Sequence, residues 1–252
     1  MEKELPTGTT LSGREIYERF LDNRFRRSVQ QMRVVSRDPG GSQQTTSFRL
    51  SIEDFRGEND EPTDGVRAKT LIEVAAPFDM RHTQYLMISK HPGPDDEFVY
   101  QPSQRRVKRV ALRRTPLMGT DYTFDDVAYH DLDEADYLRL PDEEIDATSV
   151  YVIEAQIHDD LDVEYHRTIS YLEMEHYVPL RVRYWDAHGV EVKVMTAPAA
   201  GIRAFGETWV ATQSTMHDLL QKTSSSLHID DMDTRPAFAK KLFTVTRMIQ
   251  GH

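Results

Sequence analysis

The segment FVYQPSQRRVKRVALRRTPLMGTDYTFDDV, residues 98–127, contains the strongest structural signals in this chain. It predicts two strands, residues 98–100 and 105–112, joined by a turn in which Pro102 presets the backbone angle that a type I turn needs. A breaker at residues 115–119 must end the sheet. Thr123, with Asp126 three residues later, then predicts a capped helix start, because acidic groups are stabilised near the positive end of the helix dipole.

Two motifs in this segment resemble the outer-membrane lipoprotein-sorting protein family, which has a LolA-like fold. The first motif is Tyr-x-Pro-x-x-Arg-Arg-x-x-Arg, formed here by Tyr100, Pro102, Arg105, Arg106 and Arg109. The second is LMGTDYTFDDV, residues 117–127, directly after the basic hairpin. The resemblance implies a mainly β protein with covering helices: a half-open antiparallel β-barrel that encloses an apolar cavity closed by short α-helices.

Alternating apolar and polar residues on both sides of this segment predict further strands. They lie at residues 48–52, 66–74, 85–88, 151–157, 163–171, 180–184, 190–194, 209–215 and 227–229. The connections are short and none has the length of a helical crossover, which is typical of an antiparallel sheet or barrel. Several strands are apolar on both faces, so the second face needs covering elements.

Two helices are predicted at the ends of the chain to supply such cover. Ser12 and Glu15 form a capping box at the start of an amphipathic helix that presents Ile16 and Phe20 on one side. Near the C-terminus, Pro236 precedes an apolar stripe formed by Phe238, Leu242, Val245 and Ile249.

The domain prediction is a flexible N-terminal segment, residues 1–10, followed by a single LolA-like domain, residues 11–252. Within that domain, residues 131–146 (DLDEADYLRLPDEEID) are rich in acids. We interpret them as a solvated, partly helical connector, because the ligand spacing and the glycine of a calcium loop are absent.

Composition excludes several classes of protein. The 252-residue chain has a formal net charge of −11, which argues against a nucleic-acid partner. It contains no cysteine, so disulfides, thiolate metal sites and cysteine nucleophiles are excluded. No stretch is long and apolar enough for a transmembrane segment. The polar N-terminus is unlike a signal peptide, and the resemblance favours a periplasmic protein whose signal segment was removed.

The sequence gives no positive argument for catalysis, a cofactor or a metal. His158 with Asp159, Asp160 and Asp162 comes nearest to a metal cluster, but these residues fall at a predicted hairpin turn, where aspartates bond their own backbone. No nucleophile elbow, glycine-rich phosphate loop or zinc helix motif occurs. We therefore expect no catalytic residue, no cofactor and no metal site.

The resemblance implies a periplasmic carrier that binds a lipid, a lipoprotein acyl chain or another hydrophobic molecule non-covalently. The cargo would pass to or from an inner-membrane exporter or an outer-membrane acceptor. The residues expected to contact cargo or form the lid are Met118, Tyr122, Phe124, Val127, Phe98 and Tyr100. The chemistry would be burial of an acyl chain, which contributes about 0.8 kcal/mol per methylene.

Two alternatives stay open at this stage. The protein could be a docking module of a membrane exporter that carries nothing, or an enzyme that acts on an apolar substrate. The basic hairpin is relevant to docking, because Arg105, Arg106 and Arg109 could bind lipid head groups or an acidic patch of a partner. The same residues could equally be an edge strand whose charges prevent aggregation.

Overall fold

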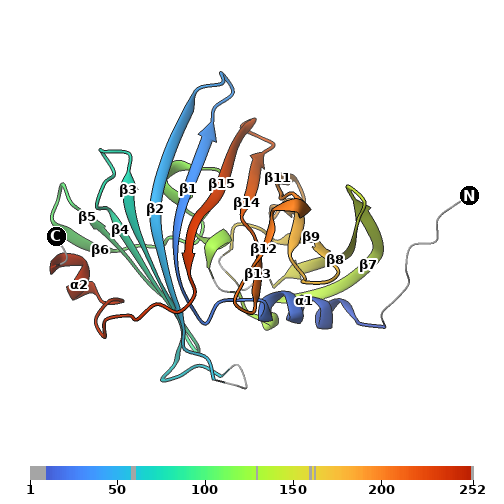
Figure 1. Cartoon of the computed structure of the whole chain (residues 1–252), viewed down its shortest axis with the longest axis horizontal. Helices are drawn as coiled ribbons and strands as arrows, with labels where there is room; N and C mark the ends of the chain where they lie inside the picture. The colour runs from blue at the N-terminus through green and yellow to red at the C-terminus, as the bar shows by residue number, and fades with distance from the viewer. Residues whose placement is uncertain (1–9, 58–60, 129, 159–160, 162, 251–252) are drawn as a thin grey trace, which may run out of the picture. The chain divides into compact units, whose positions relative to one another are not determined.

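The computed structural model describes residues 10–57, 61–128, 130–158, 161 and 163–250. In this part of the chain, 13 strands form a large antiparallel sheet with the order β6-β5-β4-β3-β2-β1-β15-β14-β11-β10-β9-β8-β7 (Figure 1). Strands β12 and β13 form a separate pair. The sheet is not closed, since β6 and β7 are its two edges.

The strands have the following bounds. They are β1 (Arg27–Arg37), β2 (Gln43–Asp54), β3 (Val66–Ala76), β4 (Gln84–Lys90), β5 (Asp96–Gln101), β6 (Arg106–Arg109), β7 (Ala135–Ile145), β8 (Thr148–Ile157), β9 (Arg167–Glu173), β10 (Pro179–Trp185), β11 (Glu191–Thr196), β12 (Ile202–Phe205), β13 (Thr208–Ala211), β14 (Gln213–Asp218) and β15 (Thr223–Asp233). The two α-helices are α1 (Gly13–Asp22) and α2 (Val245–Gln250), and the short 3₁₀ turns are η1 (Leu117–Gly119), η2 (Asp125–Val127), η3 (Leu132–Glu134) and η4 (Ala199–Gly201).

The open antiparallel sheet and its short helices confirm the predicted mainly β fold class. The enclosed apolar cavity stays a prediction. By backbone contacts the chain divides into two compact units. Unit 1 contains residues 1–24, 37–42 and 130–226, and unit 2 contains residues 25–36, 43–129 and 227–252. The single domain also stays a prediction, and residues 1–9 of the predicted flexible segment lie outside the described residues.

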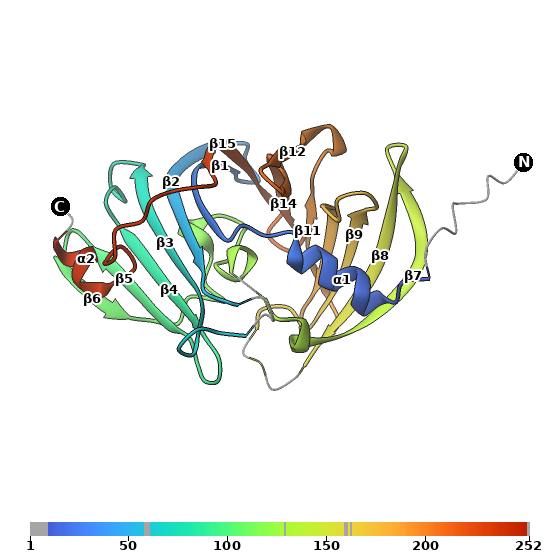
Figure 2. The same ribbon diagram turned by 60° about the horizontal axis from the view of Figure 1, so that its bottom comes forward.

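In unit 1, helix α1 packs on β7 and β8 (Figure 2). The predicted capping box is confirmed, because the Ser12 hydroxyl accepts a hydrogen bond from the Glu15 N–H and the Glu15 carboxylate accepts one from the Ser12 N–H. Ile16 is fully buried in a cluster with Ile153 and Leu172. The amphipathic helix therefore covers an apolar sheet face, as its pattern predicts.

The predicted partly helical connector at residues 131–146 is wrong for most of its length. Only Leu132–Glu134 is helical, and Ala135–Ile145 is the edge strand β7, paired with β8. Tertiary contacts outweigh the local charge: the Tyr137 ring stacks on Tyr17 of α1 with centroids 4.4 Å apart. An added Cβ on Gly13 would lie 2.7 Å from the Arg139 nitrogen, so the close approach of α1 to β7 requires glycine there.

In unit 2, strands β3, β4 and β5 are apolar on both faces. Leu71 pairs with Leu86, and Leu86 with Phe98, so these three side chains share one face. Ile72 pairs with Tyr85, and Tyr85 with Val99, on the opposite face. Both faces are buried, and each therefore needs its own cover.

The first face is covered by the C-terminal segment, but the predicted helix there is shorter than its pattern suggests. Residues 236–244 are not helical, and α2 begins only at Val245, beside β5 and β6. Phe243 and Met248 are the buried anchors, whereas the predicted Ile249 is 52% exposed. The Thr244 hydroxyl accepts a hydrogen bond from the Arg247 N–H, which fixes this late start.

Asp54 and Arg56 form a fully buried ion pair in unit 2, with side chains 0% and 2% exposed. The Arg56 Nε lies 3.1 Å from Asp54 Oδ1, and its Nη2 lies 3.1 Å from Oδ2.

Among the helices of the described residues, none is long and apolar enough to cross a membrane.

We predict that Asp54→Asn lowers the free energy of unfolding by about 3–5 kcal/mol, because it removes the negative charge that is hydrogen-bonded to the buried Arg56 cation. The matched control is Asp230→Asn, which breaks the exposed Arg33–Asp230 pair (3.0 Å, 36% and 47% exposed) and should cost at most about 1 kcal/mol. Urea denaturation followed by circular dichroism measures both, and equal losses would contradict the prediction.

Candidate functional site

The second apolar face of unit 2 is covered by residues 112–127, here called the cover segment. This segment folds back on itself: the Leu117 N–H donates to the Tyr122 carbonyl (2.7 Å) and the Phe124 N–H donates to the Thr115 carbonyl (3.1 Å). The predicted helix is only the three-residue turn η2, and its N-cap is Phe124, without a side-chain cap hydrogen bond, rather than the predicted Thr123. The predicted partners Thr123 and Asp126 are nevertheless hydrogen-bonded. The Thr123 N–H donates to Asp126 Oδ2 at 2.6 Å and the Thr123 hydroxyl lies 3.0 Å from the same oxygen.

Phe124 anchors the cover segment on the sheet. Its side chain is 1% exposed, and its ring centroid lies 4.8 Å from that of Tyr85 on β4. Leu117, Met118 and Tyr122 are also buried. Met118 has φ 52° and ψ 35°, a left-handed conformation that is strained for a long side chain. The fold-back hydrogen bonds on either side hold this residue in place.

Glu97 and Arg113 attach the cover segment to strand β5. The Glu97 carboxylate accepts a hydrogen bond from the Leu112 N–H at 2.6 Å, and its carbonyl accepts one from the Val110 N–H at 3.0 Å. The Arg113 Nε lies 3.6 Å from Asp95 and 3.7 Å from Asp125. Burial raises the pKa of Glu97 above its usual value; the Leu112 hydrogen bond opposes this shift, and the nearby Asp95 charge adds to it.

The six predicted cargo or lid residues do not come together. Met118, Tyr122 and Phe124 are buried in the cover segment, and Val127 there is half-buried. Phe98 and Tyr100 instead pack in the cluster that contains Phe243 and Met248, on the opposite face of β5. The roles of all six stay predictions, but Phe98 and Tyr100 belong to a different surface from the other four.

The three predicted docking arginines have different surroundings. Arg105 and Arg106 are exposed at the β5–β6 turn, and their side chains make no ion pair with any described residue. Arg109 is paired with Asp96, with Nη2 at 2.6 Å from Oδ1. Only the first two are therefore available without breaking an existing contact.

Sequence reasoning missed Tyr85, Glu97, Arg113 and the anchor Phe243. Glu97 is the last of three consecutive acids and directly precedes the apolar run 98–100, so the sequence does not distinguish it from its exposed-looking neighbours. For Tyr85, Arg113 and Phe243, the alternation of apolar and polar residues did not show which face of the sheet each side chain would contact.

In the described part of the chain, one group of side chains could offer ligands to a metal ion. It is Glu173, Glu175 and His176, whose ligand atoms lie within 4.8 Å of one another. The Glu173 carboxylate already accepts hydrogen bonds from the Glu175 N–H (2.7 Å) and the His176 N–H (2.9 Å). These contacts account for the grouping as a hairpin turn. Asp159, Asp160 and Asp162 of the sequence cluster lie outside the described residues.

We predict that stability falls as pH rises through the raised pKa of Glu97. The folded state binds the Glu97 proton more tightly than the unfolded state does. The stability that this proton contributes is therefore fully present below the ordinary glutamate pKa, and it is lost as the pH rises through the raised pKa of Glu97 in the folded state. Glu97→Gln keeps an acceptor for the Leu112 N–H and cannot titrate. The unfolding free energy of wild type minus that of Glu97→Gln should therefore decrease from pH 4 to pH 8 in urea titrations; a flat or rising difference would contradict this.

A family model with the description "Uncharacterized protein" matches residues 67–250. No curated protein matches the sequence. Among solved structures, a candidate outer membrane lipoprotein-sorting protein domain from Vibrio parahaemolyticus has a TM-score of 0.83 and 22% identity, over 94% of this chain and 98% of the other. A DUF1329 family protein from Desulfovibrio piger has a TM-score of 0.84 and 20% identity, over 94% and 97%.

A LolA superfamily protein from Nitrosomonas europaea is also similar, with a TM-score of 0.74 and 17% identity over 94% of this chain and 99% of the other. At these identities the likeness concerns the fold. It agrees with the motifs in residues 98–127 and with the open antiparallel sheet. The chain therefore belongs to the family of this uncharacterized-protein model and has the fold of the LolA-like lipoprotein-sorting domains.

Proposed function

We propose that the protein is a carrier of the cell envelope, which binds the apolar part of a lipid or a lipoprotein acyl chain non-covalently. The cargo lies on the face of β3–β5 that the cover segment now occupies. The observation that carries this proposal is Phe124: its buried ring, on a segment with little regular structure, packs against Tyr85 of the apolar sheet face.

The energetics of exchange support this. Burial of a ten-carbon acyl stretch contributes on the order of 8 kcal/mol. Loss of the Phe124 contacts costs on the order of 3–5 kcal/mol, and release of the strained Met118 offsets part of that cost. Displacement of the cover segment by cargo is therefore favourable, whereas displacement by water is not.

The resemblance favours a role in the periplasm, and the descriptions of two similar structures name outer membrane lipoprotein sorting and the LolA superfamily. An inner-membrane exporter or an outer-membrane acceptor would be the partner in transfer. The descriptions of these three similar structures name no enzyme. Catalysis on an apolar substrate would need a titratable group that approaches the cargo, and Glu97 is the group to test by Glu97→Gln.

We predict that Phe124→Ala increases the apparent affinity for a fluorescent fatty-acid probe about tenfold, because it raises the fraction of molecules with the cover segment displaced. The matched control is Phe243→Ala, which weakens packing on the opposite face and should leave the affinity unchanged. Fluorescence titration measures both, alongside solvent extraction of lipid from the purified protein.

The outcomes discriminate between faces and between functions. An equal rise for Phe243→Ala would move the cargo to the face that contains Phe98 and Tyr100. No uptake by wild type or Phe124→Ala, with no extracted lipid, would contradict the carrier.

The second candidate function is a docking module, and the exposed Arg105 and Arg106 favour it. Arg105 lies in the β5–β6 turn and Arg106 begins the edge strand β6, which also carries the exposed Lys108. These cations would contact an acidic patch of a membrane partner. Arg109 would support them less, because Asp96 already holds it.

We predict that Arg105→Glu combined with Arg106→Glu slows delivery of a loaded probe to a partner membrane fraction about tenfold, without a change in probe uptake. The reverse pattern, with lost uptake and normal delivery, would make these arginines structural.

A further inference from the structure

The hairpin formed by β14 and β15 in unit 1 ends in two exposed leucines. Leu219 is 43% exposed and Leu220 is 64% exposed. The other large exposed apolar residues of the described chain are not adjacent to one another in sequence. An adjacent, exposed apolar pair at a hairpin turn is a candidate for contact with another surface.

Three backbone N–H groups of this turn already have hydrogen-bond acceptors. Asp218, which is 9% exposed, accepts hydrogen bonds from the Leu220 N–H (2.9 Å) and the Gln221 N–H (2.7 Å). The Leu219 N–H donates to the Val192 carbonyl at 2.9 Å. When the tip leaves water, these N–H groups keep their hydrogen bonds. A main cost of entering an apolar environment is therefore removed.

Behind the tip lies a hollow of about 300 Å³. It is lined by Arg37, Asp38, His217, Asp218, Leu219, Lys222, Thr223 and Ser224. Arg37 and Lys222 are exposed, and neither makes an ion pair with any described residue. Both carboxylates of the hollow accept hydrogen bonds from backbone N–H groups. Asp218 accepts those of the turn described above, and Asp38 accepts one from the Ser42 N–H at 2.9 Å.

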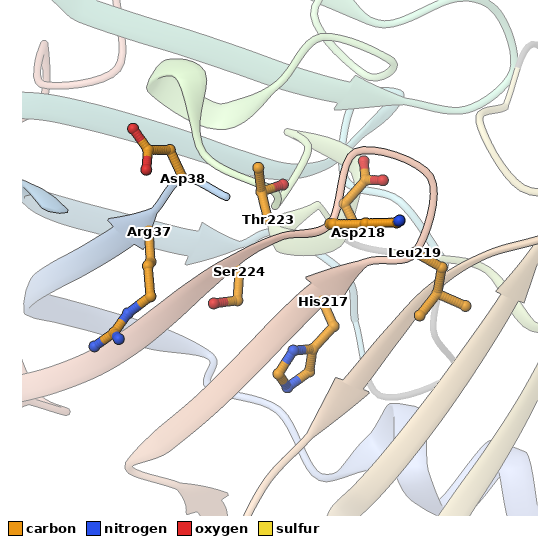
Figure 3. Close-up of a pocket in the computed structure, with 8 residues that line it drawn as sticks. Arg37, Asp38, His217, Asp218, Leu219, Thr223 and Ser224 are labelled. Atoms are coloured by element: carbon orange, nitrogen blue, oxygen red, sulfur yellow. The ribbon is translucent and has the colours of Figure 1, made fainter. Parts of the chain in front are cut away.

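Three of the donors that line the hollow extend away from the two carboxylates. In Figure 3 the side chains of Arg37, Ser224 and His217 extend to one side of the strands, and those of Asp38, Thr223 and Asp218 extend to the other. A guanidinium, a hydroxyl and an imidazole on one side form a set of donors suited to a phosphate group.

We propose that this hairpin tip docks on an anionic phospholipid bilayer, with Leu219 and Leu220 in the interfacial region and a lipid phosphate in the hollow beside Arg37. The chain carries a net charge of −11, so attraction to such a surface must be local. Two weak signals, an apolar pair and a cationic pair, together give reversible binding. Reversible binding is what a protein that visits a membrane requires.

The test is flotation of the full chain with vesicles of phosphatidylglycerol and phosphatidylethanolamine, against vesicles of phosphatidylcholine alone. Wild type should bind the anionic vesicles at least about tenfold better, and added salt should weaken binding. Leu219→Ser with Leu220→Ser, and separately Arg37→Gln with Lys222→Gln, should each reduce binding about tenfold.

Matched controls are Leu138→Ser, which removes an exposed leucine (57%) from β7, and Lys240→Gln with Lys241→Gln, which removes two exposed cations from the C-terminal segment. Both should bind as wild type does. Equal binding to both vesicle types, unchanged binding of the hairpin variants, or an equal loss in the controls would overturn the proposal. Tight binding of inorganic phosphate with no vesicle binding would also overturn it, in favour of a free-anion site.

Discussion

The structure of unit 2 depends on one constraint: strands β3, β4 and β5 are apolar on both faces. Neighbouring residues such as Leu71 and Ile72, or Tyr85 and Leu86, point in opposite directions, and all four are at least half-buried. A sheet of this kind cannot leave either face in water, so two separate parts of the chain must cover it. The C-terminal segment and the cover segment are the two parts.

The two covers differ in a way that bears on function. The C-terminal cover buries an aromatic and aliphatic cluster that includes Phe238, Phe243 and Met248, with one edge-to-face ring pair at 5.2 Å. The cover segment relies on Phe124, a short capping box and the attachments at Glu97 and Arg113. Its attachments are polar and its backbone is strained at Met118. The cover with the more easily broken contacts is the better candidate for exchange with cargo.

Charge is distributed so that attraction is local. The chain is acidic overall, yet Arg105 and Arg106 on one turn, and Arg37 and Lys222 near another, make no ion pair within the described part of the chain. Carboxylates near these sites are held by backbone N–H groups or by other cations, as Asp218 and Asp96 show. Long-range repulsion from acidic surfaces can thus coexist with specific short-range contacts.

The sequence by itself determined the class of fold and most strands, because a period of two in apolar residues specifies which side chains share a face. It also determined the capping box at Ser12 and the hydrogen-bonded pair Thr123–Asp126, since both join residues only three apart. It could not reveal that 135–145 is a strand, because that outcome depends on packing against β8 and α1. Only the tertiary structure decided that Phe98 and Phe124 lie on opposite faces, and that Glu97 holds Leu112, since these contacts join residues whose spacing carries no pattern.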